Sequence, residues 1–318
     1  MLFDLKFNHY KLFICKTIIF LVIVFLVDFL VGKTLYFLYF HQKSGSLYRT
    51  TYSIEKTKAE MLVMGSSRAN HHYPPSAFEN RLGLSYYNVG RDGQYLLYNY
   101  AILKVILKRY SPKIIIFDFV SQELEFDSRD YERLASLMPY YKKYPDIQPI
   151  LQLKSSFEKI KLLSKIYPFN SYLLTIAIGN TNFNRRDVFD IKGYIPLEGK
   201  WNEPIKITDN SRTIKIDSNK LKIYELFIQD CLKAHVKLYI VCSPYYFNFK
   251  STTLSITLGK KIAAKYHIDF YDFSQDPSFI TKPTLFDDPY HLNDTGAKIF
   301  SDSIVNLLIK KNILGLGV

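Results

Sequence analysis

The chain has 318 residues, 48% of them hydrophobic, including 26 tyrosines and 24 phenylalanines, so it can form one large α/β domain with a substantial core. Its net charge of +13 comes from scattered basic residues, without zinc-finger spacing, an RNA-binding signature or a basic helix, which argues against nucleic acid as a partner. An anionic membrane or an acidic envelope polymer explains the same charge.

The N-terminal segment is strongly apolar. Residues 18–27 are all apolar, and after Asp28 the apolar character resumes through residue 40. A helix that crosses a bilayer needs about 20 mostly apolar residues, and no small-residue cleavage site follows. We therefore expect an uncleaved single-pass membrane anchor over residues 1–40, followed by a polar linker over residues 41–60.

The orientation of this anchor is less well defined, because lysines lie on both sides of it. An early uncleaved anchor usually exports the chain that follows. We therefore expect the main domain to lie outside the cytoplasm, and a membrane-facing cytoplasmic protein is the alternative.

From residue 61 to residue 318, strand-like and helix-like segments alternate, which is typical of a parallel α/β sheet. The expected strands are Met61–Gly65, Tyr86–Val89, Lys113–Phe119, Val236–Cys242 and Ile268–Phe273. The expected helices are Pro75–Leu82, Tyr95–Tyr110, Ser218–Ala234, Ser251–Tyr266 and Asp294–Asn312. This pattern predicts a three-layer α/β/α domain with a parallel five-stranded sheet.

The alternation stops between residues 121 and 217. A segment of this length is too long for a structureless loop, so we expect a mostly helical or irregular insertion that caps the carboxyl edge of the sheet. Its aromatic residues would either contact a substrate or form a small core of the cap itself. They include Trp201, Tyr140, Tyr141, Tyr144 and Tyr194.

A Gly65–Arg68 turn follows the first expected strand. Because parallel strands place their following turns at the carboxyl edge of the sheet, Ser67 is a candidate nucleophile there. Turn or helix-capping chemistry explains the same residues. A second turn, Asn88–Gly93, follows the next strand, and Gly90 would allow a backbone N–H to approach a reacting oxygen.

The most specific signal lies near the C-terminus. Asp288 and His291 are three residues apart, so one turn can bring the carboxylate to Nδ1 of the ring. The other ring nitrogen would then face a serine delivered by a different strand. A serine, a histidine and a carboxylate arranged in this way are the groups that serine nucleophilic catalysis needs.

These three blocks together resemble the SGNH (GDSL-like) hydrolase and acyltransferase superfamily, over roughly residues 60–120 and 218–318. The resemblance implies a flavodoxin-like fold, Ser67 as nucleophile, and Asp288 and His291 as the orienting acid and the base. It also implies an oxyanion hole formed by the backbone N–H groups of Ser67 and Gly90.

Two positions depart from the family pattern. Ser66 stands where the nucleophile is usually preceded by aspartate, as in some membrane-anchored envelope members, such as the D-alanine transfer protein of the teichoic-acid pathway. The third-block asparagine has no clear match, and Ser121 and Gln122 are the two candidates to replace it. Arg68, Gln122 and Trp201 are the candidate substrate-binding residues.

The resemblance implies a membrane-anchored serine esterase or O-acyltransferase that acts on an acyl ester, with acetyl the favoured group, of an extracytoplasmic envelope carbohydrate, together with envelope-modification partner proteins. The missing asparagine favours the alternative, a non-catalytic binding or assembly component of an envelope polysaccharide system. No metal or organic cofactor is expected, since the cysteines form no metal-ligand pattern. They are Cys15, Cys231 and Cys242.

Overall fold

The fold is taken from a computed structural model that describes residues 2–181, 191–208, 214–249 and 252–311, with only the backbone described for residues 2–8, 206–208 and 248–249. A five-stranded parallel sheet has the strand order β2-β1-β3-β5-β7. The strands are β1 (Met61–Gly65), β2 (Tyr86–Asn88), β3 (Ile114–Asp118), β5 (Lys237–Cys242) and β7 (Asp269–Asp272). The predicted sheet is confirmed, with each strand within two residues of its expected bounds.

Apolar residues on successive strand positions explain why both faces of the sheet are covered. In β1, Met61 and Val63 belong to one buried core, whereas Leu62 and Met64 belong to the other. Because side chains alternate across a strand, a wholly apolar strand must be buried on both faces.

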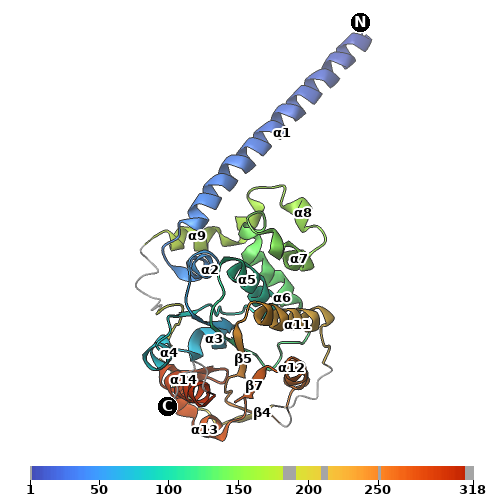
Figure 1. The fold of residues 1–318 in the computed structure, drawn as a ribbon. Coiled ribbons are helices and arrows are strands. Elements are labelled where there is room, and N and C mark those ends of the chain that lie inside the picture. Colours follow the sequence, from blue (N-terminus) through green and yellow to red (C-terminus); the bar gives the residue numbers. More distant parts are fainter. Residues whose placement is uncertain (1, 182–190, 209–213, 250–251, 312–318) are drawn as a thin grey trace.

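Helices on the two faces complete the three layers (Figure 1). The face that carries Leu62 packs against α5 (Leu96–Arg109), α11 (Ser218–Lys233) and α12 (Leu254–Lys265). The other face packs against α3 (Ser67–His72), α4 (Pro75–Leu82), α13 (Pro277–Ile280) and α14 (Asp294–Lys310). The predicted α/β/α architecture is confirmed.

The N-terminal helix α1 (Leu2–Phe40) projects from one end of the domain (Figure 1). Its stretch His9–Phe40 is long and apolar enough to cross a membrane, with a mean hydropathy of 2.7 in its most apolar window, none of which is buried. From Asp28 onward the helix contacts the domain, and Tyr39 is fully buried. Tyr39 therefore belongs to the protein core.

Residues 41–60 differ from the predicted linker, because they contain the helix α2 (Gly45–Glu55). Its buried side chains include Leu47 and Ile54, and it packs against α5. Thr50 and Thr51 are also buried, and their hydroxyl groups lie within hydrogen-bond distance of tyrosine hydroxyls. The polar composition of residues 41–60 therefore did not indicate this helix, because its threonine hydroxyl groups are buried and lie within hydrogen-bond distance of tyrosine hydroxyl groups.

The insertion consists of short helices that pack mainly against α1, α2 and α5. They are α6 (Ser128–Glu132), η1 (Arg133–Tyr140), η2 (Pro145–Ile147), α7 (Gln148–Leu151), η3 (Gln152–Lys154), α8 (Glu158–Lys161), η4 (Tyr167–Tyr172) and α9 (Leu173–Gly179). Tyr140, Tyr141 and Tyr194 are buried, so these rings serve packing rather than a substrate platform.

The remaining short strands lie in the second half of the chain. A two-stranded parallel sheet pairs β4 (Lys206–Thr208) with β6 (Phe247–Phe249). A small antiparallel pair joins β8 (Phe286–Asp288) and β9 (His291–Leu292), with a one-residue irregularity in its register. The 3-10 helix η5 (Pro283–Leu285) precedes β8.

Candidate active site

Ser67 lies at the carboxyl edge of the sheet, where it is the first residue of α3, two positions after the end of β1. The turn depends on Gly65, whose φ of 144° lies in a region that L side chains rarely adopt. A Cβ atom on Gly65 would also lie 2.8 Å from the carbonyl oxygen of Asp118. The close approach of β1 and β3 therefore requires glycine here and presents Ser67 at the edge.

His291 reaches Ser67 from the other end of the chain. Its Nε2 lies 2.7 Å from Ser67 Oγ, and its Nδ1 lies 2.9 Å from Asp288 Oδ2. Asp288 Oδ1 also accepts the backbone N–H groups of Tyr290 at 2.7 Å and of His291 at 3.0 Å. These backbone contacts fix the carboxylate relative to the imidazole before any substrate binds.

The carboxylate of Asp288 is held in its ionised form. Partial burial alone would raise its pKa, but the hydrogen bond and charge of His291 and the two backbone N–H groups outweigh burial and lower the pKa below its ordinary value. An ionised Asp288 favours the tautomer with the proton on Nδ1 of His291. Nε2 can then accept the hydroxyl proton of Ser67, which is the arrangement that activates a serine.

The backbone N–H of Gly90, the predicted second oxyanion donor, is already hydrogen-bonded in this structure. It donates to Asn88 Oδ1 at 2.9 Å. A Cβ atom on Gly90 would lie 2.7 Å from both Ala69 Cβ and the backbone nitrogen of Asn70. Gly90 therefore allows the turn after β2 to pack closely against α3, and the geometry gives no support for an oxyanion role.

Arg68 is a buried residue beneath the site, with only 3% of its surface exposed. Its Nε and Nη2 atoms donate to Ser243 Oγ at 3.0 and 2.6 Å, and Nε lies 3.6 Å from a carboxylate oxygen of Asp118. The guanidinium stacks 3.6 Å from the centre of the Tyr245 ring. Although Arg68 borders the cavity described below, these contacts make it a structural group beneath Ser67 rather than an exposed substrate ligand.

His72 extends this buried network to the histidine-bearing strand. Its Nε2 accepts the backbone N–H of Leu292 at 2.9 Å, so its Nδ1 carries the proton and donates to Ser243 Oγ at 2.9 Å. Burial, with the nearby charge of Arg68, holds the pKa of His72 well below its ordinary value, so the ring is neutral. The network thus connects the helix that carries Ser67 with the strand that carries His291.

A cavity of about 480 Å³ opens in front of Ser67 and His291. Ser121 and Gln122, the two candidates for the missing third-block asparagine, both line it. The two ends of the insertion contribute the polar and charged walls, which include Glu125, Asp127, Arg129, Asp130 and Lys215. Aromatic rings complete the lining, and they are Tyr95, Phe126, Tyr245, Phe247 and Tyr290. Tyr290, with 54% of its surface exposed, is the most accessible of them.

Trp201 does not line this cavity. Its ring packs against the core on the α14 side of the sheet, and its backbone N–H donates to the carbonyl oxygen of Phe286 at 2.8 Å. The structure therefore brings together Ser67, Asp288, His291 and Gln122, whereas Trp201 lies apart from them.

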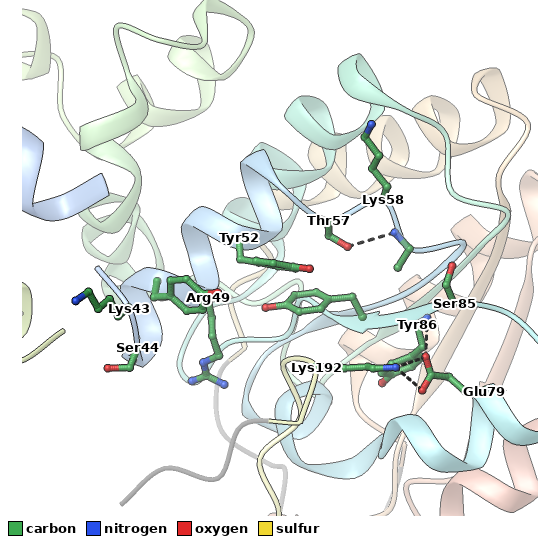
Figure 2. Close-up of a pocket in the computed structure, with 14 residues that line it drawn as sticks. Lys43, Ser44, Arg49, Tyr52, Thr57, Lys58, Glu79, Ser85, Tyr86 and Lys192 are labelled. Carbon is green, nitrogen blue, oxygen red and sulfur yellow. Dashed lines mark hydrogen bonds and ion pairs between the residues drawn. The ribbon is translucent and has the colours of Figure 1, made fainter. Parts of the chain in front are cut away.

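A second, larger cavity of about 570 Å³ lies beside α2 and is shown in Figure 2. Its lining is basic and aromatic, with Lys43, Arg49, Lys58, Lys192, Tyr48, Tyr52 and Tyr87. No histidine lines it among the described residues, so it offers no base for a nucleophile. The chemistry of the Ser67 cavity identifies that smaller cavity as the candidate active site.

Within the described residues, no group of three or more histidine, cysteine and acidic side chains is placed to hold a metal ion.

Several site residues were missed by the sequence analysis. Asp118 ends β3, and Ser243 directly follows β5, so the edge rule that identified Ser67 could also have identified them. Tyr245 and Tyr290 gave no such signal, because an aromatic residue in a loop looks the same whether it packs in a core or borders a cavity.

No family model matches this sequence, and a search of curated proteins finds no similar sequence. Among solved structures, the crystal structure of an acetyl xylan esterase, AlAXEase, aligns with a TM-score of 0.40 and 12% sequence identity, over 78% of this chain and 99% of that chain. A likeness this distant carries no functional argument, so the function is inferred from the geometry of the site.

Proposed function

We propose that this protein is a membrane-anchored serine esterase or O-acyltransferase that acts on an acyl ester, with acetyl the favoured group, of an extracytoplasmic envelope carbohydrate. The observation that carries the proposal is the hydrogen-bonded series Ser67–His291–Asp288, with distances of 2.7 and 2.9 Å. Ser67 comes from the first strand–helix turn of the domain, and Asp288 and His291 come from near the C-terminus. The three side chains are hydrogen-bonded in series at the edge of the sheet, beside an open cavity.

In the proposed mechanism, Ser67 Oγ attacks the ester carbonyl carbon while His291 Nε2 takes the hydroxyl proton. Asp288 stabilises the imidazolium that forms. The tetrahedral intermediate collapses, the bond to the alcohol oxygen breaks, and His291 returns the proton to that oxygen. Water or a sugar hydroxyl then gives its proton to His291 and attacks the acyl carbonyl carbon. The bond between the acyl carbon and Ser67 Oγ breaks, His291 returns the proton to Oγ, and the free acid or the new sugar ester leaves.

The oxyanion needs at least one preorganised donor. The backbone N–H of Ser67 is at the first helical position of α3, where no intrahelical acceptor exists for it. The carboxamide of Gln122, which lines the same cavity, is our candidate for the second donor. Loss of one such donor typically costs about 10²–10³ in rate, so the occupied N–H of Gly90 would make this a slower enzyme unless Gln122 replaces it.

The lining of the cavity favours a carbohydrate ester. Sugars present polar hydroxyls and apolar ring faces, and the cavity combines charged side chains with exposed rings. Tyr290 and Phe247 meet edge to face with their centroids 4.8 Å apart, so they can form a shaped aromatic wall.

The alternative is a catalytically degenerate component that binds or assembles an envelope polysaccharide. The engaged N–H of Gly90 and the absence of the third-block asparagine favour it. The intact geometry of Ser67, His291 and Asp288 opposes it.

A fluorophosphonate probe separates the two functions. We expect the full-length protein in nanodiscs to be labelled on the peptide that contains Ser67, and Ser67→Ala to abolish the label. Ser66→Ala is the matched control, because the Ser66 side chain makes no capping hydrogen bond to α3. A folded wild-type protein that stays unlabelled, and that also forms no acyl-enzyme with an activated acetyl donor, would support the binding component. If Ser67 is labelled, mass spectrometry of envelope glycans from a deletion strain would identify the acyl group and its acceptor.

A further inference from the structure

The end of the domain from which α1 projects is formed largely by the insertion (Figure 1). Asp28 of α1 accepts hydrogen bonds there from Ser164 Oγ at 2.5 Å and from the backbone N–H of Lys165 at 2.7 Å. Before Asp28, residues 9–27 are all exposed. Between Lys16 and Lys33 the helix has 16 residues, about 24 Å at 1.5 Å per residue, so with the lysine side chains extended toward the two interfaces it can cross a bilayer core of roughly 30 Å. Lys33, Asp28 and the segment 164–165 therefore lie at the domain-side end of the span.

A cluster of exposed apolar side chains lies at this same end of the domain. We call it the apolar foot, and it consists of Phe157, Ile160, Leu163, Leu173 and Leu174. Leu163 and Leu174 are 75% and 73% exposed, more than any other large hydrophobic residue outside α1 in the described part of the chain. Leu163 immediately precedes Ser164, so it lies at the level of Asp28. Clustered exposure of this kind indicates an interaction surface, because water would otherwise hydrate it unfavourably.

A groove of about 400 Å³ runs between α1 and the insertion at this level. Three lysines, Lys33, Lys142 and Lys165, border it. The rest of the lining is mostly apolar or aromatic, with Phe29, Gly32, Tyr36, Met138, Pro139, Leu162, Ser164, Pro168 and Phe169. No acidic side chain is among these lining residues. In the described part of the chain, Lys33 lies 5.7 Å from the centre of the Phe29 ring, and the nearest acidic charge to Lys165 is that of Asp28. The groove thus combines three cations with a hydrocarbon-like wall.

The positive charges in the groove are only partly balanced by the protein, through the charge of Asp28, which acts on Lys165. The neighbouring ammonium of Lys165, together with burial, lowers the pKa of Lys142. Asp28 is the nearby acidic group, but its oxygens already accept the hydrogen bonds from Ser164 and Lys165. An anion placed between Lys142 and Lys165 would relieve their repulsion.

We propose that this groove binds the headgroup of an anionic phospholipid, with its phosphate held by Lys142, Lys165 and Lys33 and an acyl chain lying along α1. The apolar foot then rests in the interfacial layer of the same leaflet. The insertion is accordingly a membrane-seating element in addition to a wall of the active-site cavity.

The position of the groove favours a lipid over a free phosphate ion. It opens beside Phe29 and Tyr36 of α1, which are both exposed apolar or aromatic residues of this helix. A free phosphate needs the lysines alone, whereas a phospholipid also uses the apolar wall. Each lysine near an anionic surface contributes about 1 kcal/mol, or roughly fivefold in affinity.

Native mass spectrometry of the full-length protein in detergent, titrated with phosphatidylglycerol or phosphatidylcholine, tests the proposal. We expect tighter binding of phosphatidylglycerol, and about 25-fold weaker binding in the double variant Lys142→Gln/Lys165→Gln. The control is Lys261→Gln/Lys282→Gln, which removes two exposed lysines elsewhere and should bind normally. Equal binding of the two lipids, or an unaffected double variant, overturns the proposal. Displacement by excess inorganic phosphate would assign the groove to a free anion and would also overturn it.

Depth-dependent fluorescence quenching tests the apolar foot independently. In nanodiscs with brominated acyl chains, Leu163→Trp and Leu174→Trp should be strongly quenched after the signal of Trp201 is subtracted. Ile299→Trp and Ile309→Trp are the controls, because both residues are exposed on α14, away from the end that carries α1 (Figure 1). Foot positions no more quenched than these controls would show that this end of the domain does not touch the bilayer.

Discussion

The backbone N–H of Leu292 donates a hydrogen bond to Nε2 of His72, at a distance of 2.9 Å. Leu292 directly follows His291, and His72 ends the helix that Ser67 begins. This one contact therefore joins the strand that carries the candidate base to the helix that carries the candidate nucleophile. Ser243 continues the connection, because it contacts both His72 and Arg68.

His72 is accordingly expected to act as a positioning residue. In His72→Ala the buried N–H of Leu292 loses its acceptor, at a cost of about 1–3 kcal/mol, and His291 is held less firmly. We expect kcat on an activated acetate ester to fall more than tenfold with little change in KM. His72→Gln, whose Oε1 can replace Nε2 as the acceptor, should recover part of this loss. A purely structural role would lower the melting temperature and leave kcat of the folded protein unchanged.

Substitutions of the three candidate catalytic residues should lower turnover by different amounts. Ser67→Ala and His291→Ala should abolish turnover of p-nitrophenyl acetate with little change in melting temperature, since both side chains border the open cavity. Asp288→Asn should lower kcat by about 10³–10⁴, because it no longer favours the productive tautomer of His291. Steady-state kinetics and thermal melts of the same preparations give both readouts. Full activity in Ser67→Ala would contradict the mechanism.

Tyr290 and Trp201 should differ in their effect on substrate size. Tyr290 is exposed at the cavity, so Tyr290→Ala should lower kcat/KM for an acetylated oligosaccharide far more than for p-nitrophenyl acetate. Trp201 packs against the core, so Trp201→Ala should instead lower the melting temperature and affect both substrates equally. Selective loss of the oligosaccharide reaction in Trp201→Ala would restore Trp201 as a substrate contact.

The sheet and the Ser67–His291–Asp288 arrangement could be predicted because both follow from local rules. Apolar runs such as Ile114–Phe117 identify strands, and parallel strands place their following turns at one edge. The spacing of Asp288 and His291 fixes their contact within a single hairpin. These rules need no knowledge of which distant residues touch.

The predictions that the structure does not support concern residues whose role depends on distant contacts. Gly90 looks like an oxyanion donor until Asn88 is seen to occupy its N–H. Arg68 follows the candidate nucleophile, but Ser243, 175 residues away, determines where its guanidinium points. The helix α2 was missed because its polar residues are buried against tyrosines of other elements. In each case the sequence gives the type and position of the residue, but not the distant residue that it contacts in the fold.

Glu123 should make stability depend on pH in the near-neutral range. Its carboxylate is buried and accepts the N–H groups of Leu96 and Val120, and burial raises its pKa from 4.5 to about 7. Because the folded state holds this proton more tightly than the unfolded state, stability is greatest below about pH 4.5 and falls as the pH rises to about 7. The change amounts to a few kcal/mol.

Thermal melts from pH 4.5 to 7.5 provide the measurement. Glu123→Gln should show a much weaker decline in melting temperature than the wild type. Glu60→Gln is the control, because the partners Lys113 and Ser85 lower the pKa of Glu60 to about 2. The titration of Glu60 therefore changes stability only below pH 4.5, outside the range of these melts. Identical slopes in the wild type and Glu123→Gln would show that another group titrates.

The orientation in the membrane is expected to place the domain outside the cytoplasm. Alkaline phosphatase fused after Val318 should be active, whereas a green fluorescent protein fused at the same position should be dim. The uncleaved apolar segment motivates this expectation, although lysines flank it on both sides. The opposite reporter pattern would remove the envelope carbohydrate from the proposed function.

The hydrogen bonds to Asp28 and the packing of α2 leave no slack between α1 and the domain. An enzyme on a flexible tether searches a volume set by the length of that tether. In the proposed function, with α1 across a membrane, these contacts would instead hold Ser67 at a nearly constant height above the lipid, within a thin layer. Turnover should then depend on how many esters lie within that layer per unit area of membrane, and a substrate anchored too deep or too far out would escape reaction however abundant it is.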